Sequence, residues 1–318
     1  MSSELTGGVS TEAACRPVWA RPESYWQPSH LVESAWIGHA PFAFWITAAL
    51  EPSIFVELGT HNGFSYFAFC EAVRRLGLDT KCFAIDTWEG DDHAGFYDES
   101  VFELVRSVNF EQYDAFSKLL RGYFDDNLAQ FSDGSIDLLH IDGQHGYDDV
   151  KHDYEAWLPK MSPRGVILFH DIAVRERGFG VWKLWEEVND DYPSFAFDHA
   201  HGLGVLVVGK DLPTPVLAFA NAGSEEASAI RQHYSELGAV TAAAGALDLE
   251  REQLRAAITD SERRLAESEH RAEGLEVTVD QLVNSVAWRS TKPLRAIFGL
   301  VPDGIRIRLK RPARPQKN

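Results

Sequence analysis

The sequence of 318 residues lacks the features that mark several large classes of protein. Its three cysteines (Cys15, Cys70 and Cys82) show no CxxC spacing, which argues against a zinc ribbon or a disulfide framework. Its longest uninterrupted apolar run, residues 40–50, is 11 residues long and too short to cross a bilayer. Residues 1–4 lack the basic and apolar regions that begin a signal peptide. These absences predict a cytoplasmic protein.

Positive charge is scarce except at one end of the chain. The sequence has 30 Lys/Arg against 48 Asp/Glu, a net charge of −18. Residues 286–318 hold nine Lys/Arg and one acid (+8), so the other 285 residues, with 21 Lys/Arg and 47 acids, carry −26. Because so acidic a body repels polyphosphates, no nucleic-acid partner is expected. The basic tail, with Trp288, either makes peripheral contact with the inner face of an anionic membrane or stays solvated.

Composition and periodicity divide the chain into five segments. Residues 1–29 are loop-like and contain several prolines. Residues 30–210 are expected to form the main domain, beginning with a helix that starts near Pro41. Residues 211–245 are expected to form a helical linker and residues 246–286 a coiled coil. Residues 287–318 form the basic tail of the sequence.

Apolar strands alternate with helices in the main domain. The expected strands are 54–58, 82–85, 117–120, 136–141 and 165–169, followed by a hairpin of 195–197 and 205–208. The expected helices are 64–76, 124–131, 148–161 and 180–189. This alternation predicts an α/β fold with a largely parallel sheet buried on both faces. Ligands bind such sheets beyond the carboxyl ends of the strands.

A heptad pattern follows the main domain. The d positions are Leu247, Leu254, Ser261, Ser268, Leu275 and Leu282, and the a positions are Arg251, Ile258, Leu265, Ala272, Val279 and Val286. The pattern predicts a coiled coil of about 40 residues that self-associates or docks on a protein partner. The alternative is a solvated helix that packs on its own domain.

The turn after the first strand has the residues of a nucleoside site. Gly59 permits a sharp turn, and Gly63 lets the next helix start close to the sheet. A dinucleotide site would have a third glycine where His61 stands, and Glu57 would repel a pyrophosphate. Asp86, at the end of the second strand, is placed to bind the two hydroxyls of a ribose. Nucleoside recognition without phosphate recognition indicates S-adenosylmethionine, although two glycines also occur in ordinary strand-to-helix turns.

Four segments in this order resemble the class I S-adenosylmethionine-dependent methyltransferases. The resemblance is closest to the bacterial branch found in polysaccharide and sugar-modifying gene neighbourhoods. The segments are VELGTHNGFS (56–65), AIDTWEGD (84–91), IDLLHIDGQH (136–145) and GVILFHD (165–171). The resemblance implies a Rossmann-like class I methyltransferase sheet, mostly parallel with an antiparallel last strand, followed here by the helical coiled coil.

The resemblance also implies which residues contact the cofactor. The methionine and adenosine side would be held by Glu57, Gly59, Thr60, His61, Asn62, Gly63 and Ser65. The ribose and adenine would be held by Asp86, Thr87, Trp88, Gly122 and Tyr123, with Asp142 completing the site. Asp86 would bind the ribose and Trp88 would form a wall of the adenine pocket.

Asp142, His145, His170 and Asp171 stand at the ends of two adjacent expected strands and can face one cleft. Carboxylates bind hard cations, so Asp142, His170 and Asp171 are expected to hold Mg²⁺ or Mn²⁺. His145 is expected to act as general base on a substrate hydroxyl whose pKa the metal lowers. The pattern resembles the metal-dependent O-methyltransferases of macrolide sugars and catechols. The alternatives are simple solvation of the strand-end acids and a surface or capping role for His145.

The predicted function is therefore transfer of a methyl group from S-adenosylmethionine to a hydroxyl of a sugar or surface polysaccharide. One alternative is O-methylation of a small phenolic or natural-product acceptor. Another is a non-catalytic scaffold whose coiled coil organises glycan assembly. His152 and His199 are expected to take no part.

Overall fold

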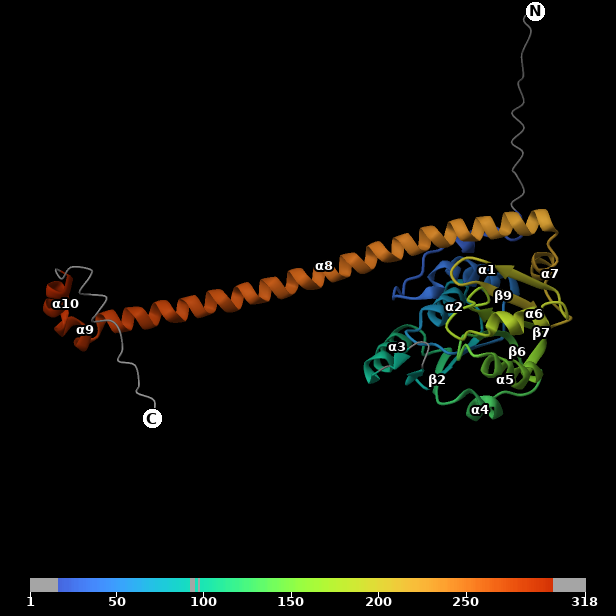
Figure 1. The fold of residues 1–318 in the computed structure, drawn as a ribbon, viewed down its shortest axis with the longest axis horizontal. Coiled ribbons are helices and arrows are strands. Elements are labelled where there is room, and N and C mark those ends of the chain that lie inside the picture. Colours follow the sequence, from blue (N-terminus) through green and yellow to red (C-terminus); the bar gives the residue numbers. More distant parts are fainter. Residues whose placement is uncertain (1–16, 92–94, 97, 300–318) are drawn as a thin grey trace, which may run out of the picture. The chain divides into compact units, whose positions relative to one another are not determined.

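The computed structural model describes residues 17–91, 95–96 and 98–299 (Figure 1). The chain forms two compact units, residues 1–250 and residues 251–318, which are described separately here. Predictions for residues 1–16 and 300–318, including Cys15 and most of the basic tail, lie outside the described residues. No helix in the described part of the chain is both long and apolar enough to span a membrane.

The first unit is built on a seven-stranded sheet with the order β5-β2-β1-β6-β7-β9-β8. Its strands are β1 (Ile54–Leu58), β2 (Lys81–Asp86), β5 (Ser117–Arg121), β6 (Ile136–Ile141), β7 (Met161–His170), β8 (Ser194–Phe197) and β9 (Leu203–Val207). The first five pair in parallel, and β9 is antiparallel to both of its neighbours. The predicted mostly parallel Rossmann-like sheet with an antiparallel last strand is confirmed.

Helices cover both faces of this sheet. They are α1 (Ala40–Leu50), α2 (Phe64–Leu76), α3 (Glu99–Gln112), α4 (Phe124–Asn127), α5 (Tyr147–Trp157), α6 (Val181–Val188), α7 (Thr214–Ala220) and the start of α8 (Ser224–Asn284). Short 3-10 turns are η1 (Pro22–Tyr25), η2 (Ala35–His39), η3 (Leu128–Gln130) and η4 (Leu158–Lys160). The core on one face joins α1, α2, α7 and α8, and the core on the other face joins α5 and α6.

Helix α1 accounts for the longest apolar run of the sequence. It begins beside Pro41 as expected, because a proline in the first turn of a helix has no N–H to leave unpaired. All 11 of its residues are buried. A run that long, whose one polar side chain (Thr47) bonds to the Ala43 carbonyl of the same helix, therefore marks a helix enclosed by the core.

Two elements of the first unit were absent from the sequence-based prediction. Helix α3 follows Asp98, which caps it by accepting from the Ser100 N–H, and only Val105 and Asn109 of this helix are buried. A small two-stranded sheet of β3 (Gly90–Asp91) and β4 (Gly95–Phe96) precedes it. Both lie at the surface, where weak apolar periodicity leaves little signal.

The last helices of the first unit pack on the same core as the sheet. Phe219 of α7 and Ile230 and Tyr234 of α8 are at most 1% exposed. Tyr234 donates its hydroxyl proton to the Trp19 carbonyl (2.7 Å) and hydrogen-bonds with Ser24 Oγ (3.0 Å). The predicted domain limit at residue 210 therefore precedes two helices that contribute to this core.

The second unit, residues 251–318, contains the end of α8, α9 (Val286–Ser290) and α10 (Lys292–Gly299). Residues 251–284 are all exposed, including the apolar heptad positions. Helix α8 ends at Asn284 because Ser285 is extended (ψ 149°) and caps α9 by accepting from the Trp288 N–H. Val286, predicted at the last a position, thus lies outside the helix.

Candidate active site

A cavity of about 650 Å³ lies beyond the carboxyl ends of β1, β2 and β6. This is the position in which an open parallel sheet binds ligands. Part of its wall comes from the loops after these strands, through Gly59, Asp86 and Asp142. Helix α5 adds Asp149 and Asp153 on another side.

The loop between β1 and α2 depends on its two glycines. Gly59 has φ +83°, and a Cβ on it would lie 2.1 Å from the Asp142 carbonyl oxygen. Gly63 has φ +80°, and a Cβ there would lie 2.6 Å from the Phe67 ring. The backbone therefore approaches both the β6 loop and helix α2 more closely than a side chain allows. His61, between them, also has a positive φ of 47°.

Asp86 organises this loop through hydrogen bonds to the backbone. Its Oδ2 accepts from the N–H groups of Thr60 (2.7 Å) and His61 (2.9 Å), and its Oδ1 accepts from the Trp88 N–H (2.7 Å). The Asp86 residue also lines the cavity. Its role is thus wider than the ribose binding expected from the sequence.

The structure brings some of the predicted cofactor residues to the cavity wall and leaves others behind it. Those that line the cavity are Gly59, His61, Asp86, Thr87, Tyr123 and Asp142. Those outside its described lining are Glu57, Thr60, Asn62, Gly63, Ser65, Trp88 and Gly122.

Trp88 was expected to form a wall of the adenine pocket, but it is not among the described residues that line the cavity. It supports the loop between β1 and α2 instead. Its side chain is 1% exposed and packs against the Phe102 ring at 4.9 Å. Its indole N–H donates to the His61 carbonyl (3.0 Å). The aromatic residues that do line the cavity are Phe96, Tyr123 and Phe124.

The cavity wall is acidic. The carboxylates that line it are Asp86, Glu89, Asp125, Asp142, Asp149 and Asp153, and no Lys or Arg is among its described lining residues. Burial raises the pKa of Asp153 to about 7, against a smaller lowering effect of His152. The site therefore favours cationic or hydroxyl-rich ligands and disfavours anions.

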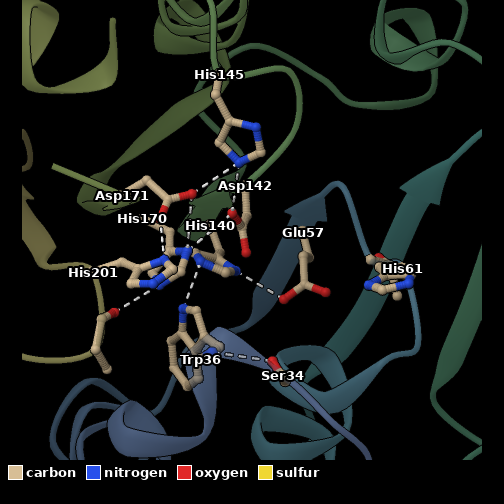
Figure 2. A network of polar contacts seen from close by, with 12 residues as sticks. Ser34, Trp36, Glu57, His61, His140, Asp142, His145, His170, Asp171 and His201 are labelled. Carbon is tan, nitrogen blue, oxygen red and sulfur yellow. Dashed lines mark hydrogen bonds and ion pairs between the residues drawn. The ribbon is translucent and has the colours of Figure 1, made fainter. Parts of the chain in front are cut away.

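A buried pair of polar residues lies beneath the loop between β1 and α2. Glu57 and His140 are register partners on β1 and β6, both fully buried, and the His140 Nδ1–H donates to Glu57 Oε2 (2.8 Å) (Figure 2). The Trp36 indole N–H donates to His140 Nε2 (3.0 Å), which fixes the neutral tautomer. Burial raises the pKa of Glu57, and the bond from His140 opposes this shift. Glu57 is thus a component of the core beneath the cavity.

The predicted catalytic residues converge at the ends of β6 and β7 (Figure 2). His145 Nε2 lies 2.9 Å from Asp171 Oδ2 and 3.7 Å from Asp142 Oδ1. His170 Nδ1 lies 3.2 Å from Asp142 Oδ1. His201, on the β8–β9 loop, lies 3.1 Å from Asp171 Oδ1. The four predicted residues therefore share one cluster, and His201 is a fifth member.

Electrostatics in this cluster favour charged imidazoles. Burial lowers the pKa of His145, but Asp142 and Asp171 outweigh it and raise that pKa to about 9. The same balance raises the pKa of His170 to about 10. Burial opposes ionisation of Asp142 and Asp171, yet the neighbouring histidines hold the pKa of each well below its usual range.

The donor set fits a divalent cation. Asp142, His170 and Asp171 each offer a ligand atom, and these atoms lie within 4.8 Å of one another. Carboxylates suit Mg²⁺ and Mn²⁺, whereas imidazole is a poorer ligand for Mg²⁺. His170 must lose its proton before it can coordinate a metal, so cation binding and proton release are linked.

Two residues of the site had no predicted role. His140 is the single polar residue among the apolar positions of Leu138–Ile141, and that interruption was the available signal. His201 follows Ala200, and both have positive φ values (67° and 47°), which the sequence does not reveal. His152, expected to take no part, lines the cavity and pairs with exposed Asp125 (2.9 Å).

Comparison with known proteins supports a methyltransferase domain in this region. Residues 56–172 match a family described as a methyltransferase domain. Uncharacterized protein y4gI of Sinorhizobium fredii is 55% identical over 179 residues, which is 56% of this chain and 20% of that protein. The chain thus spans about a fifth of the length of that curated relative.

Solved methyltransferases also align with the chain at low sequence identity. The O-methyltransferase TomG of Streptomyces achromogenes, solved with S-adenosylmethionine, is 17% identical, with a TM-score of 0.42 over 57% of this chain and 83% of TomG. The methyltransferase PaMTH1 of Podospora anserina is 15% identical, with a TM-score of 0.41 over 56% of this chain and 89% of PaMTH1.

Proposed function

We propose that the chain transfers a methyl group from S-adenosylmethionine to a hydroxyl of a sugar or surface polysaccharide. The observation that carries the proposal is the cluster of Asp142, His145, His170 and Asp171 at the carboxyl edge of the sheet. Two members of the cluster, Asp142 and His145, line the same cavity as Gly59 of the β1–α2 loop and Asp86 at the end of β2. A donor site and an acid–base site therefore share one space.

The acidic wall suits the proposed cofactor. S-adenosylmethionine carries a sulfonium cation, an ammonium group and one carboxylate, so its net charge is positive, and the cavity presents carboxylates without a described Lys or Arg. After accepting three backbone N–H bonds, Asp86 keeps about one of its four lone-pair sites, which is enough for one ribose hydroxyl.

His145 is the proposed general base. The acceptor oxygen attacks the methyl carbon, the carbon–sulfur bond breaks with its electron pair going to sulfur, and the hydroxyl proton goes to His145. Against the lowering effect of burial, Asp142 and Asp171 raise the pKa of His145 to about 9, so the ring must lose a proton before it can act as the base, and turnover should rise as the pH approaches 9. The His145 ring is held by Phe179, whose ring stacks on it at 4.5 Å.

A divalent cation would be held by Asp142, His170 and Asp171. Such an ion supplies a Lewis acid that lowers the pKa of an acceptor hydroxyl. If the ion is required, EDTA should abolish turnover while sparing cofactor binding, and Mg²⁺ or Mn²⁺ should restore it. Full turnover in EDTA would assign the two acids to positioning His145 alone.

The wall chemistry favours a neutral, hydroxyl-rich acceptor. Carboxylates accept hydrogen bonds from sugar hydroxyls, and the acidic wall repels phosphorylated or carboxylated groups. A small phenolic acceptor is the second candidate, because Phe96 and Tyr123 line the cavity with exposed rings (79% and 68%) that could stack on it.

A mass-spectrometric screen tests the proposal. The full chain is incubated with S-adenosylmethionine and separate sets of neutral glycans, nucleotide sugars and phenols, and each product is examined for the gain of one methyl group. His145→Ala should lower turnover by about 10²–10⁴ with unchanged cofactor affinity. His199→Ala, at a histidine bonded to the Gly38 carbonyl, is the control. If the chain failed to bind S-adenosylmethionine, the scaffold alternative would gain support.

A further inference from the structure

The end of helix α8 carries an exposed apolar stripe. Ile258, Leu265 and Val279 occupy a positions, and Leu254, Leu275 and Leu282 occupy d positions. Each of these six side chains has 57–66% of its surface exposed. We call this stripe the seam. Large aliphatic residues repeated at heptad spacing bury poorly against a lone helix and well against a second one.

The side chains of the seam indicate how many helices pair. Two of its three large a residues, Ile258 and Val279, are β-branched, and all three of its large d residues are leucine. This distribution favours two-stranded parallel coiled coils. Arg251 at an a position and Ser261 and Ser268 at d positions interrupt the stripe, and polar residues at such positions fix the register of the helices.

Charges beside the seam distinguish parallel from antiparallel pairing. In a parallel pair in register, each g residue faces the e residue five positions further along the other helix. The charged pairs are then Glu250 with Arg255, Arg264 with Glu269, and Arg271 with Glu276, and each is formed twice by symmetry. The two intervening pairs are Ala257 with Glu262 and Thr278 with Val283. Every charged pair is attractive.

Antiparallel pairing would bring like charges together. It sets e residues against e residues, and Glu262, Glu269 and Glu276 occupy successive e positions. It also sets g residues against g residues, including Arg264 and Arg271. Like charges at these positions oppose association.

We infer that the partner of the seam is a second copy of this chain, joined to the first in a parallel, in-register, two-stranded coiled coil over residues 251–284. The inference stands on the exposed seam and the charges beside it. It does not depend on the proposed chemistry, and a chain without methyl-transfer activity would still pair.

The mass of the full chain in solution is the first test. Sedimentation equilibrium should give twice 35.6 kDa, the mass of one chain. A mass of one chain throughout, or of three or four chains, would overturn the inference.

A charge exchange tests whether the charges beside the seam join the two copies. Arg264→Glu with Arg271→Glu in one variant, and Glu269→Arg with Glu276→Arg in another, each make two charged pairs repulsive. Each variant alone should have a dimer dissociation constant raised about tenfold or more. Mixed in equal amounts, the two variants should pair with each other, because all the exchanged pairs are then attractive. Failure of the mixture to pair would contradict parallel pairing. Arg263→Glu, on the outward face, is the control and should leave the dimer intact.

A cysteine scan gives an independent result. Under mild oxidation, Leu282→Cys should form a disulfide between copies, because d residues of parallel helices meet their own counterparts. In an antiparallel pair the two cysteines would be about 45 Å apart. Asp280→Cys, at an outward b position, is the matched control and should cross-link far more slowly. Equal rates for the two variants would rule out the parallel seam.

Discussion

The carboxylate of Asp86 accepts hydrogen bonds from three backbone N–H groups. Two of these belong to Thr60 and His61, so the bonds hold the β1–α2 loop against the end of β2. Asp86→Ala should therefore weaken S-adenosylmethionine binding by about five- to a hundredfold. Isothermal titration calorimetry measures the change. Asp86→Asn keeps one acceptor oxygen and should lie between the two proteins. Unchanged affinity in a folded Asp86→Ala variant would remove this residue from the cofactor site.

His140 is the partner of a fully buried carboxyl group, Glu57. His140→Ala would leave that group buried without its bond from His140, so the free energy of unfolding should fall by about 1–3 kcal/mol. Urea denaturation gives this value. His152→Ala removes an imidazole from an exposed pair with Asp125 and should change stability little. Equal effects of the two substitutions on the free energy of unfolding would show that the buried pair stabilises the fold no more than the exposed pair does.

Asp153 couples stability to pH through its pKa, which burial raises to about 7. A carboxyl whose pKa is higher in the folded state than the usual 3.8 stabilises the fold when protonated, and this contribution is lost as the pH rises from about 4 through 7. The Asp153→Asn variant has no carboxyl group at this position, so its stability does not fall in this way as the pH rises. The stability of the variant relative to the parent should thus rise over that range, by up to about 4 kcal/mol. A difference that stays constant from pH 4 to 8 would mean that Asp153 ionises normally.

At the scale of residues, the sequence predicts the groups whose roles follow from local position. Gly59 and Gly63 have the positive φ values that their turn required, and Asp142 and His170 meet because adjacent parallel strands end at one edge. Trp88 shows the limit. Its burial against Phe102 depends on helix α3, which the sequence did not predict.

At the scale of elements, α7 and the start of α8 complete the core of the main domain. A chain ending at residue 211 would lose Phe219, Ile230 and Tyr234, each worth about 1.5–3 kcal/mol of burial. It should unfold at lower urea concentration than a chain ending at residue 250, which should keep cofactor affinity. Circular dichroism and calorimetry make the comparison. Equal stability of the two chains would show that these helices only cover the surface.

The strands were predictable and some helices were not, for a physical reason. The central parallel strands are buried on both faces and so appear as apolar runs, such as Ile136–Ile141, whereas the edge strand β5 is partly exposed and gives a weaker pattern. Helix α3 buries only two of its residues and so has no clear apolar period, whereas the helix predicted over residues 124–131 is present as α4 and the 3-10 turn η3. The end of α8 at Asn284 is set by the capping of Ser285, which the heptad pattern did not indicate.

At the scale of the whole molecule, charge separates the body from the tail. With +8 in residues 286–318, the full chain should bind vesicles that contain anionic lipid, more weakly as salt rises, and a chain ending at residue 285 should not. Co-sedimentation with anionic and neutral vesicles measures this. Binding of the full chain to neither kind would leave the tail solvated.

The bonds between Tyr234, Trp19 and Ser24 join segments more than 200 residues apart, and they set an order of folding. During synthesis, the N-terminal segment can pack on α1 early, through the bond from the Trp45 indole to the Val18 carbonyl (3.0 Å), but its contacts with α8 must wait until that helix has emerged from the ribosome. Contacts so distant in sequence form slowly, because a long loop must close first. The ribosome synthesises the seam directly after the part of α8 that contains Tyr234. Closure of the domain is independent of concentration, whereas pairing of helices requires two chains to meet. Each new chain can therefore complete its own core before it meets a second copy, which lowers the risk of exchanging segments with a neighbour.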